Sequence, residues 1–221
     1  MKKKLVWIIP AAFVSIITLV LSIAFMVMEI KTINMKSDYG YLKEDQTYSL
    51  KVEIDNLDLV KQHVSCGYAT IEMMSAYYGS KVTEDELQTK NNGGVSTSSS
   101  NGFLKEINAS IPNKAFVKHS YLKNDVLLKE IHDSLNNHNP VAIEWAAEYE
   151  GEWTLHFSLV SGLDIINDNV TVYNPYGYIE NLKIGDFVNR TTFKAYKHFP
   201  LFLNFGFAFG AFEKNTIFFA K

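Results

Sequence analysis

The sequence predicts an α+β protein in which helices come first and an antiparallel sheet follows. Between residues 65 and 136 the chain carries helix caps and apolar side chains at helical spacing. After Asn139-Pro140 it changes to short apolar or alternating runs that are typical of strands. Hydrophobic residues make up 47% of the 221 residues and charged residues 20%, which suffices for one buried core.

The composition excludes several classes of protein. Lys and Arg number 21 and Asp and Glu number 24, a formal net charge of −3, whereas binding to nucleic acid needs a basic excess. Nucleic acid is therefore not an expected partner. Cys66 is the single cysteine, which excludes an internal disulfide, a cysteine-rich zinc site and a cysteine-held iron–sulfur cluster. We expect no metal and no cofactor.

An uncharged stretch from Leu5 to Met28 lies near the amino terminus. As a helix rising about 1.5 Å per residue, it is long enough to cross a bilayer. The lysines from Lys2 to Lys4 precede it, so the positive-inside bias predicts a cytoplasmic amino terminus and an extracytoplasmic remainder. A signal peptide cleaved near Ser22 and Ala24 is the alternative, although the apolar regions of such peptides span only about 7 to 15 residues.

The first helix of the folded part is predicted to begin at Ser65 or Cys66 and to end at Gly79. Ser65 suits the N-cap and Gly79 the C′ position. Thr83 and Glu86 have the spacing of a capping box and predict a second, short helix. The only cysteine therefore lies in the first turn of a helix.

Further elements follow from the same signals. Residues 91–101, rich in Gly, Ser, Thr and Asn, predict a loop. Helices are predicted over residues 102–108 and 125–136, the second capped by Asn124. Upstream, the alternating residues 48–54 predict an edge strand.

The carboxyl-terminal half of the sequence is predicted to consist mainly of strands. They are predicted at residues 141–145, 155–163, 170–173 and 216–219, with a turn at 167–169. Phe205, Phe207 and Phe209 alternate with small residues, which predicts another strand with one bulky and one close-packed face.

Four residues have the chemistry of a thiol-dependent enzyme. A helix N-terminus favours thiolate over thiol, which makes Cys66 a candidate nucleophile, although a buried cysteine can also be a plain small hydrophobe. Gln62 lies four residues earlier, where its amide can complete an oxyanion hole with the Cys66 N–H. His156 and Asn174 lie on predicted strands, where a base and its orienting amide could face Cys66.

These motifs, in this order, resemble the papain-like cysteine peptidases, in particular the bacterial bacteriocin-processing branch that removes double-glycine leaders. The resemblance covers about residues 58–195. It rests on Gln62-x-x-x-Cys66-Gly67, Tyr77-Tyr78-Gly79, Asn139-Pro140-Val141-Ala142-Ile143, His156-Phe157-Ser158-Leu159-Val160-Ser161-Gly162 and Val172-Tyr173-Asn174-Pro175-Tyr176-Gly177.

The resemblance implies a papain-like fold, with a helix that begins at the nucleophile packed on the sheet. It implies that Cys66 is the nucleophile, His156 the general base and acid, Asn174 the orienting group and Gln62 the oxyanion donor. Asn174 replaces the commoner Asp of that family, so the negative charge beside the imidazole is absent. A simple hairpin turning at residues 167–168 would pair His156 with about residue 179, so its contact with Asn174 requires a bulge, such as one at Gly162, or a skewed approach.

The other histidines have plainer interpretations. His63, three residues from the thiol, is expected at the rim of the site rather than as the base. His119, His132, His138 and His198 are expected to be surface or satisfied core residues.

The sequence thus predicts a cytoplasmic lysine cluster, membrane anchor and linker over residues 1–36, and a papain-like peptidase domain over 37–221. The expected function is cleavage of a peptide or isopeptide bond in a peptide or protein substrate, outside the cytoplasm. Two alternatives stay open. A Cys-dependent acyl transferase needs the same four residues, and an inactive peptidase-like binding module would keep the fold without the chemistry. A purely structural membrane protein is a third reading.

Overall fold

The computed structural model describes residues 2–194 and 201–221, so His198 lies outside the described residues. An antiparallel sheet forms its centre, in the order β2-β7-β3-β4-β5-β6, with β1 paired to β4 beyond the end of β3. The strands are β1 (Val52–Glu53), β2 (Phe116–His119), β3 (Val141–Tyr149), β4 (Glu152–Asp164), β5 (Asn169–Asn174), β6 (Tyr178–Leu182) and β7 (Thr216–Ala220).

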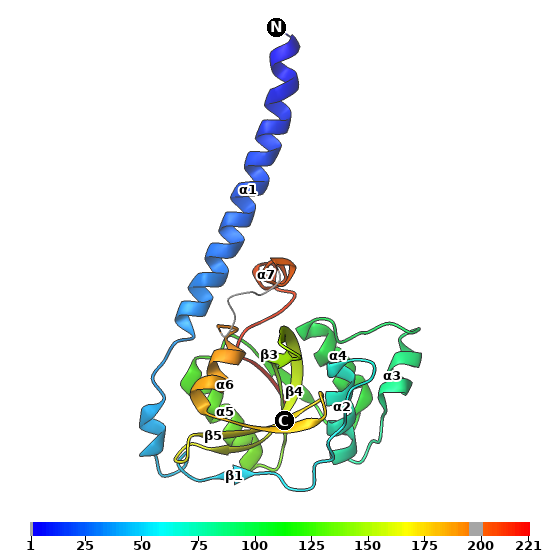
Figure 1. Ribbon diagram of the computed structural model, residues 1–221, viewed down its shortest axis with the longest axis vertical. Coiled ribbons are helices and arrows are strands. Elements are labelled where there is room, and N and C mark those ends of the chain that lie inside the picture. Colours follow the sequence, from blue (N-terminus) through cyan, green and yellow to red (C-terminus); the bar gives the residue numbers. More distant parts are fainter. Residues whose placement is uncertain (1, 195–200) are drawn as a thin grey trace.

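Helices cover the sheet on both sides. Figure 1 shows α2, α3 and α4 on one side and α5 and α6 on the other, while α1 projects away from the domain with α7 beside it. The helices are α1 (Lys2–Asn34), α2 (Cys66–Tyr77), α3 (Glu84–Lys90), α4 (Ser100–Ser110), α5 (Asn124–Asn136), α6 (Ile184–Thr191) and α7 (Leu201–Ala208), with a 3₁₀ turn at Gly40–Lys43. This arrangement confirms the predicted α+β class.

The predicted caps of the first two helices are present. Ser65 is the N-cap of α2, its side chain accepting from the Tyr68 N–H, and Gly79 follows the helix with a φ of 79°. Thr83 and Glu86 form the capping box of α3. The cap predicted for α5 is wrong: Asn124 is its first residue, because the Asn124 side chain instead accepts from Asn215.

The strand predicted at the three alternating phenylalanines is also wrong, since this segment forms α7. The alternation has a different physical cause. Phe205 packs edge-to-face on Phe25 of α1 at 5.6 Å between ring centroids, and Phe207 is buried against Met28. A Cβ on Gly206 would come within 2.4 Å of the Phe212 ring, so the small residue permits close packing within a helical turn. Tertiary contacts thus decide the structure of this segment.

Two strands, β2 and β6, were not predicted, and the predicted strand at residues 48–54 shrinks to two residues. The main core lies between the helices and the sheet. Phe103 of α4 stacks on Phe157 of β4 at 4.4 Å and contacts Phe218 of β7, which joins a helix to two strands.

The helix α1 is long and apolar enough to cross a membrane from Ala12 to Asn34. Its side chains in that part are mostly exposed, among them Phe13, Val14 and Leu19. Length and composition fit either a membrane anchor or a signal sequence.

Candidate active site

Cys66 is the first residue of α2, and α2 packs on β4, the strand that carries His156. The N–H groups of Cys66, Gly67 and Phe157 lie near its sulfur and act to lower the thiol pKa. Burial among protein atoms outweighs them and raises that pKa to about 11, although part of the residue stays accessible. The N–H groups at the helix start thus act in the expected direction, favouring the thiolate, but desolvation is the larger effect.

His156 and Asn174 are joined directly. The Nε2 atom of His156 lies 2.9 Å from Oδ1 of Asn174, and both side chains are buried. The ring of Tyr176 stacks on the imidazole at 4.1 Å between centroids. Burial lowers the pKa of His156 to about 3, against the opposite effect of the Asn174 hydrogen bond. The resting imidazole is therefore neutral.

The position of the turn and a β-bulge together bring these residues closer than expected. Asp164 pairs with Asn169, so the hairpin turns one residue earlier than residues 167–168, which alone would set residue 177 opposite His156. The β4–β5 register shifts between Val160 and Gly162, as the sequence led us to expect. Extending the register from the Val160–Val172 pair places His156 opposite Tyr176, two residues from Asn174. The His156–Asn174 contact therefore depends both on the bulge and on a diagonal approach of the two side chains, which are the two possibilities that the sequence offered.

The amide of Asn174 is fixed in one orientation. Its Nδ2 donates to Oε1 of Glu180 at 2.6 Å, and its Oδ1 accepts from the Tyr176 N–H at 2.9 Å. Because an ionised carboxylate only accepts, Nδ2 must face Glu180 and Oδ1 must face His156. His156 therefore donates through Nε2–H, which leaves the lone pair on Nδ1.

Glu180 is a functional candidate that the sequence analysis missed. Its other oxygen accepts from Arg190 at 2.9 Å, and the Arg190 guanidinium lies over the rings of Trp145 and Trp153. No local signal marks it, because it lies on the unpredicted strand β6 and reaches Asn174 only through β5–β6 pairing. The negative charge that is absent at residue 174 is present one hydrogen bond further away.

Gln62 lies beside the same strand end. Its backbone N–H donates to the Pro175 carbonyl at 2.7 Å, which brings it next to Asn174. The side-chain Oε1 is buried and has no hydrogen-bond partner in the part of the chain that the structure describes. An unpartnered buried amide is costly, and a half-turn of its last torsion would put the donor Nε2 in the same place.

Glu84 holds the loop between Gln62 and Cys66. Its buried carboxylate accepts from the backbone N–H groups of His63, Val64 and Ser65 at 3.1, 3.0 and 2.9 Å. The capping box predicted a helix start here, but it gave no sign of this contact. His63 itself is exposed, with Nε2 at 2.8 Å from Asp85, which raises its pKa and places it at the rim as expected.

The four predicted residues thus come from neighbouring elements: the loop before α2, the start of α2, β4 and the end of β5. Phe157 links two of them, because its N–H acts on the Cys66 thiol and it follows His156 directly. Among the described residues no group of three His, Cys, Asp or Glu side chains could hold a metal ion.

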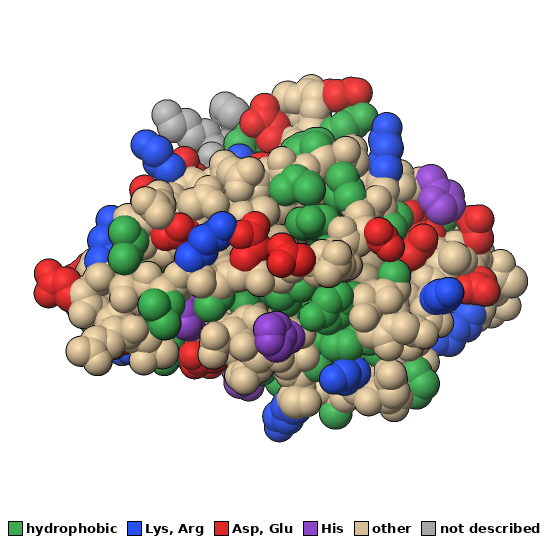
Figure 2. Space-filling model, turned by 90° about the horizontal axis from the view of Figure 1, so that it is seen from below, with side chains coloured by type: hydrophobic (Ala, Val, Ile, Leu, Met, Phe, Trp, Pro, Cys, Tyr) green, Lys and Arg blue, Asp and Glu red, His purple; other side chains and the backbone are tan. Residues whose placement is uncertain are grey.

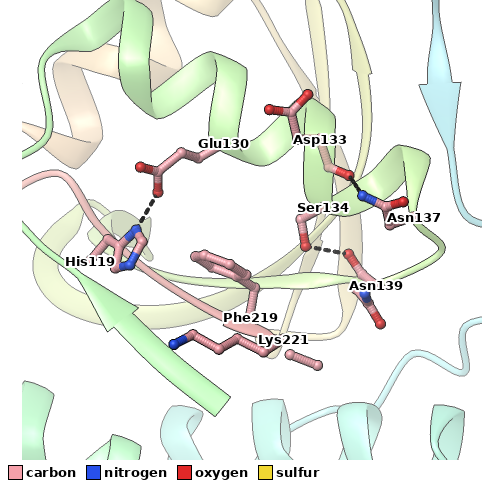
Figure 3. Close-up of a pocket in the computed structure, with 9 residues that line it drawn as sticks. His119, Glu130, Asp133, Ser134, Asn137, Asn139, Phe219 and Lys221 are labelled. Carbon is pink, nitrogen blue, oxygen red and sulfur yellow. Dashed lines mark hydrogen bonds and ion pairs between the residues drawn. The ribbon is translucent and has the colours of Figure 1, made fainter. Parts of the chain in front are cut away.

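A separate cavity of about 500 Å³ lies between α5 and the strands β2 and β7. In Figure 3 His119 points at Glu130 among the residues that line this cavity, and its Nδ1 lies 2.7 Å from Oε2 of Glu130. None of the four predicted residues lines it. Figure 2 shows the end of the domain away from α1, where acidic and basic side chains are interspersed.

A helix that begins at a cysteine, packed on an antiparallel sheet that carries a histidine and an asparagine on adjacent strands, defines the papain-like cysteine peptidase fold. Within that class, the chain belongs to the Peptidase_C39 like family, whose model matches residues 54–199. This membership makes it a cysteine peptidase.

Among solved structures, the fold is similar to that of a double glycine motif protease from an AMS/PCAT transporter, solved in complex with the leader peptide. The TM-score is 0.50 with 13% sequence identity, and the match covers 76% of this chain and 97% of the other. No curated protein matches the sequence.

Proposed function

We propose that the protein is a membrane-anchored, extracytoplasmic cysteine peptidase that cleaves a peptide or isopeptide bond with Cys66, His156, Asn174 and Gln62. The orientation of Asn174 carries the proposal. Because Glu180 fixes this amide, His156 keeps its Nδ1 lone pair free to accept a proton. A buried histidine with only a structural role would not need a fixed tautomer with a free Nδ1 lone pair.

The resting pair is a neutral thiol and a neutral imidazole, so proton transfer accompanies attack. As Sγ of Cys66 bonds to the substrate carbonyl carbon, its proton passes to Nδ1 of His156. The carbonyl oxygen becomes an oxyanion that accepts from the Cys66 N–H and from Nε2 of Gln62. The imidazolium formed is stabilised by Asn174.

The remaining steps use the same groups. His156 returns its proton to the leaving amine, the C–N bond breaks, and a thioester to Cys66 is left. Water then gives a proton to His156 and attacks the thioester, which releases the acid and regenerates the thiol. An amine in place of water would give acyl transfer, so only the products separate these two reactions.

The location outside the cytoplasm rests on α1 and the lysines before it. The span from Ala12 to Asn34 meets the length and apolarity of a membrane helix, and the positive-inside bias favours a cytoplasmic amino terminus. A peptide substrate is favoured by the structural neighbour, which was solved with a peptide bound.

The test uses the full chain in lipid nanodiscs with a diverse peptide pool, read by mass spectrometry. We expect cleavage products with the wild type and none with Cys66→Ala. A second incubation with a primary amine distinguishes acyl transfer, which adds the mass of the amine to the product. Equal product patterns for wild type and Cys66→Ala contradict the proposal, as does a wild type that cleaves nothing in the pool or in lysate from its host.

A further inference from the structure

The helix α7 presents an apolar surface that the sheet domain does not cover. Its sequence from residue 201 to 208 contains no charged residue. Phe202 is 69% exposed, and Phe209, just after the helix, is 59% exposed. Figure 1 shows α7 standing apart from the sheet and next to α1. An aromatic surface of this kind marks an interaction site.

The contacts between α7 and α1 indicate the depth at which α7 would lie in the membrane. Phe205 packs on Phe25, and Phe207 is buried with Met28. Both α1 residues lie inside the apolar span from Ala12 to Asn34, near its domain end. If α1 crosses a bilayer, α7 lies against it where the hydrocarbon gives way to headgroups. The exposed phenylalanines of α7 then continue the lipid-facing surface of α1.

The charges around this junction fit the phosphates of lipid headgroups. Lys31, Lys36 and Lys194 are exposed here, and the first two follow the uncharged stretch of α1 that ends at Met28. Lys36 and Lys194 act on each other electrostatically, with Glu29 as the acidic group near them. Lys214, also close by, donates to Thr32 of α1 at 3.0 Å and so ties the domain to the helix end. Aromatic side chains on the side of the acyl chains, with lysines on the side of the headgroups, are typical of helices that lie in a membrane interface.

We propose that α7 is an interfacial membrane helix whose Phe202 and Phe209 insert among the acyl chains of the leaflet next to the domain. This docking fixes the domain at a second point besides α1. It borders the strand segment that carries His156: Met28 and Phe207 pack with Ala146 and Leu155, which form the cross-strand pair next to Trp145 and His156. Because successive strand residues face opposite sides of a sheet, this cluster lies on the face away from the imidazole.

The experiment measures lipid contact at single positions, and it rests on the anchoring part of the proposed function. In full-length Cys66→Ser protein, a cysteine is introduced by Phe202→Cys, by Val14→Cys in α1 or by Val95→Cys in an exposed loop of the domain. Each is labelled with an environment-sensitive fluorophore in nanodiscs containing doxyl-labelled lipid. Because Phe202 is largely exposed, its substitution leaves the core intact.

We expect the probes at residues 14 and 202 to show blue-shifted emission and loss of intensity with doxyl lipid, and the probe at 95 to be quenched by aqueous iodide alone. Quenching by lipid at 14 but by iodide at 202 overturns the role of α7 while leaving the anchor in place. A probe at 202 that neither quencher reaches means a protein partner or a second copy covers it, which also overturns the proposal. Iodide quenching at 14 refutes the anchor and the docking together.

Discussion

The Glu180 carboxylate accepts a 2.6 Å hydrogen bond from Nδ2 of Asn174, and this contact determines which nitrogen of His156 is free to act as a base. Papain-like relatives with an aspartate have a negative charge directly beside the imidazole. Here the carboxylate is that of Glu180, and Asn174 lies between it and the imidazole. An asparagine at residue 174 is the matching choice, because a second carboxylate at this distance would repel the first.

Glu180→Gln should lower kcat roughly ten-fold, the equivalent of about 1.4 kcal/mol. The neutral amide offers Asn174 a donor as well as an acceptor, so only the Tyr176 N–H still distinguishes Oδ1 from Nδ2, and the tautomer of His156 is held less firmly. The measurement is the turnover of a peptide found in the screen described above. Glu152→Gln, on an exposed residue of β4, is the matched control and should leave kcat unchanged.

Asn174→Asp should be harmful alone and tolerated together with Glu180→Gln. In the single variant two carboxylates would meet at hydrogen-bond distance, which raises the pKa of one of them and pushes the side chains apart. The double variant restores one negative charge and one amide in exchanged positions. A double-mutant cycle on kcat should show a coupling that favours the double variant. Additive losses would mean that Glu180 does not act through Asn174.

Gln62→Ala should reduce kcat roughly 100- to 1,000-fold, as loss of an oxyanion donor does in other enzymes. Substrate affinity should change little, because this donor is engaged mainly by the transition state. Gln88→Ala in α3 provides the control for loss of a glutamine amide. A Gln62→Ala variant that raises KM and keeps kcat would assign Gln62 to substrate binding instead.

The reaction of Cys66 with iodoacetamide should be slow at pH 6 and should accelerate steadily up to pH 10. Only the thiolate reacts, and a thiol pKa raised to about 11 keeps the thiolate fraction small throughout that range. Unfolding in urea returns the pKa to about 8.5, so alkylation at pH 7 should then speed up. Mass spectrometry after timed quenching gives the rates. Fast alkylation of the folded protein at pH 6 would instead show a thiolate–imidazolium pair at rest.

Glu84→Gln should lower the free energy of unfolding by roughly 1 to 3 kcal/mol, because charge-assisted hydrogen bonds to the three N–H groups before Cys66 are lost or weakened. The loop also carries Gln62, so kcat should fall as well. Urea unfolding in detergent measures the first effect. Glu86→Gln, on the exposed face of the same helix, keeps the capping-box acceptor and should be nearly neutral.

The parts of the fold that the sequence predicts well are those set by neighbouring residues. Ser65 and the pair Thr83 and Glu86 mark helix starts, because a cap is made within one turn. The segment around Phe207 was misassigned, because its period-two alternation matches a strand while its partners lie on α1. Local pattern and tertiary packing conflict there, and packing decides.

The residues of the candidate site also fall into those that local motifs predict and those that only the folded structure brings together. Cys66 could be found from its helix start, and His156 and Asn174 from the motifs around them. Glu180 and Glu84 could not, because each acts on a segment that only the folded arrangement brings near: β5 through strand pairing, and the loop before α2 through burial of a carboxylate. Charged residues that accept from several donors have no periodic signature.

The β-bulge between Val160 and Gly162 determines which face of the sheet His156 occupies relative to β5. Smoothing it would give β4 and β5 one more regular pair and would set Gly177 opposite His156. A slip of one residue turns every side chain before that point to the other face, the imidazole included. In such a regular hairpin the imidazole would face away from Asn174, so the bulge is part of what holds His156 beside it.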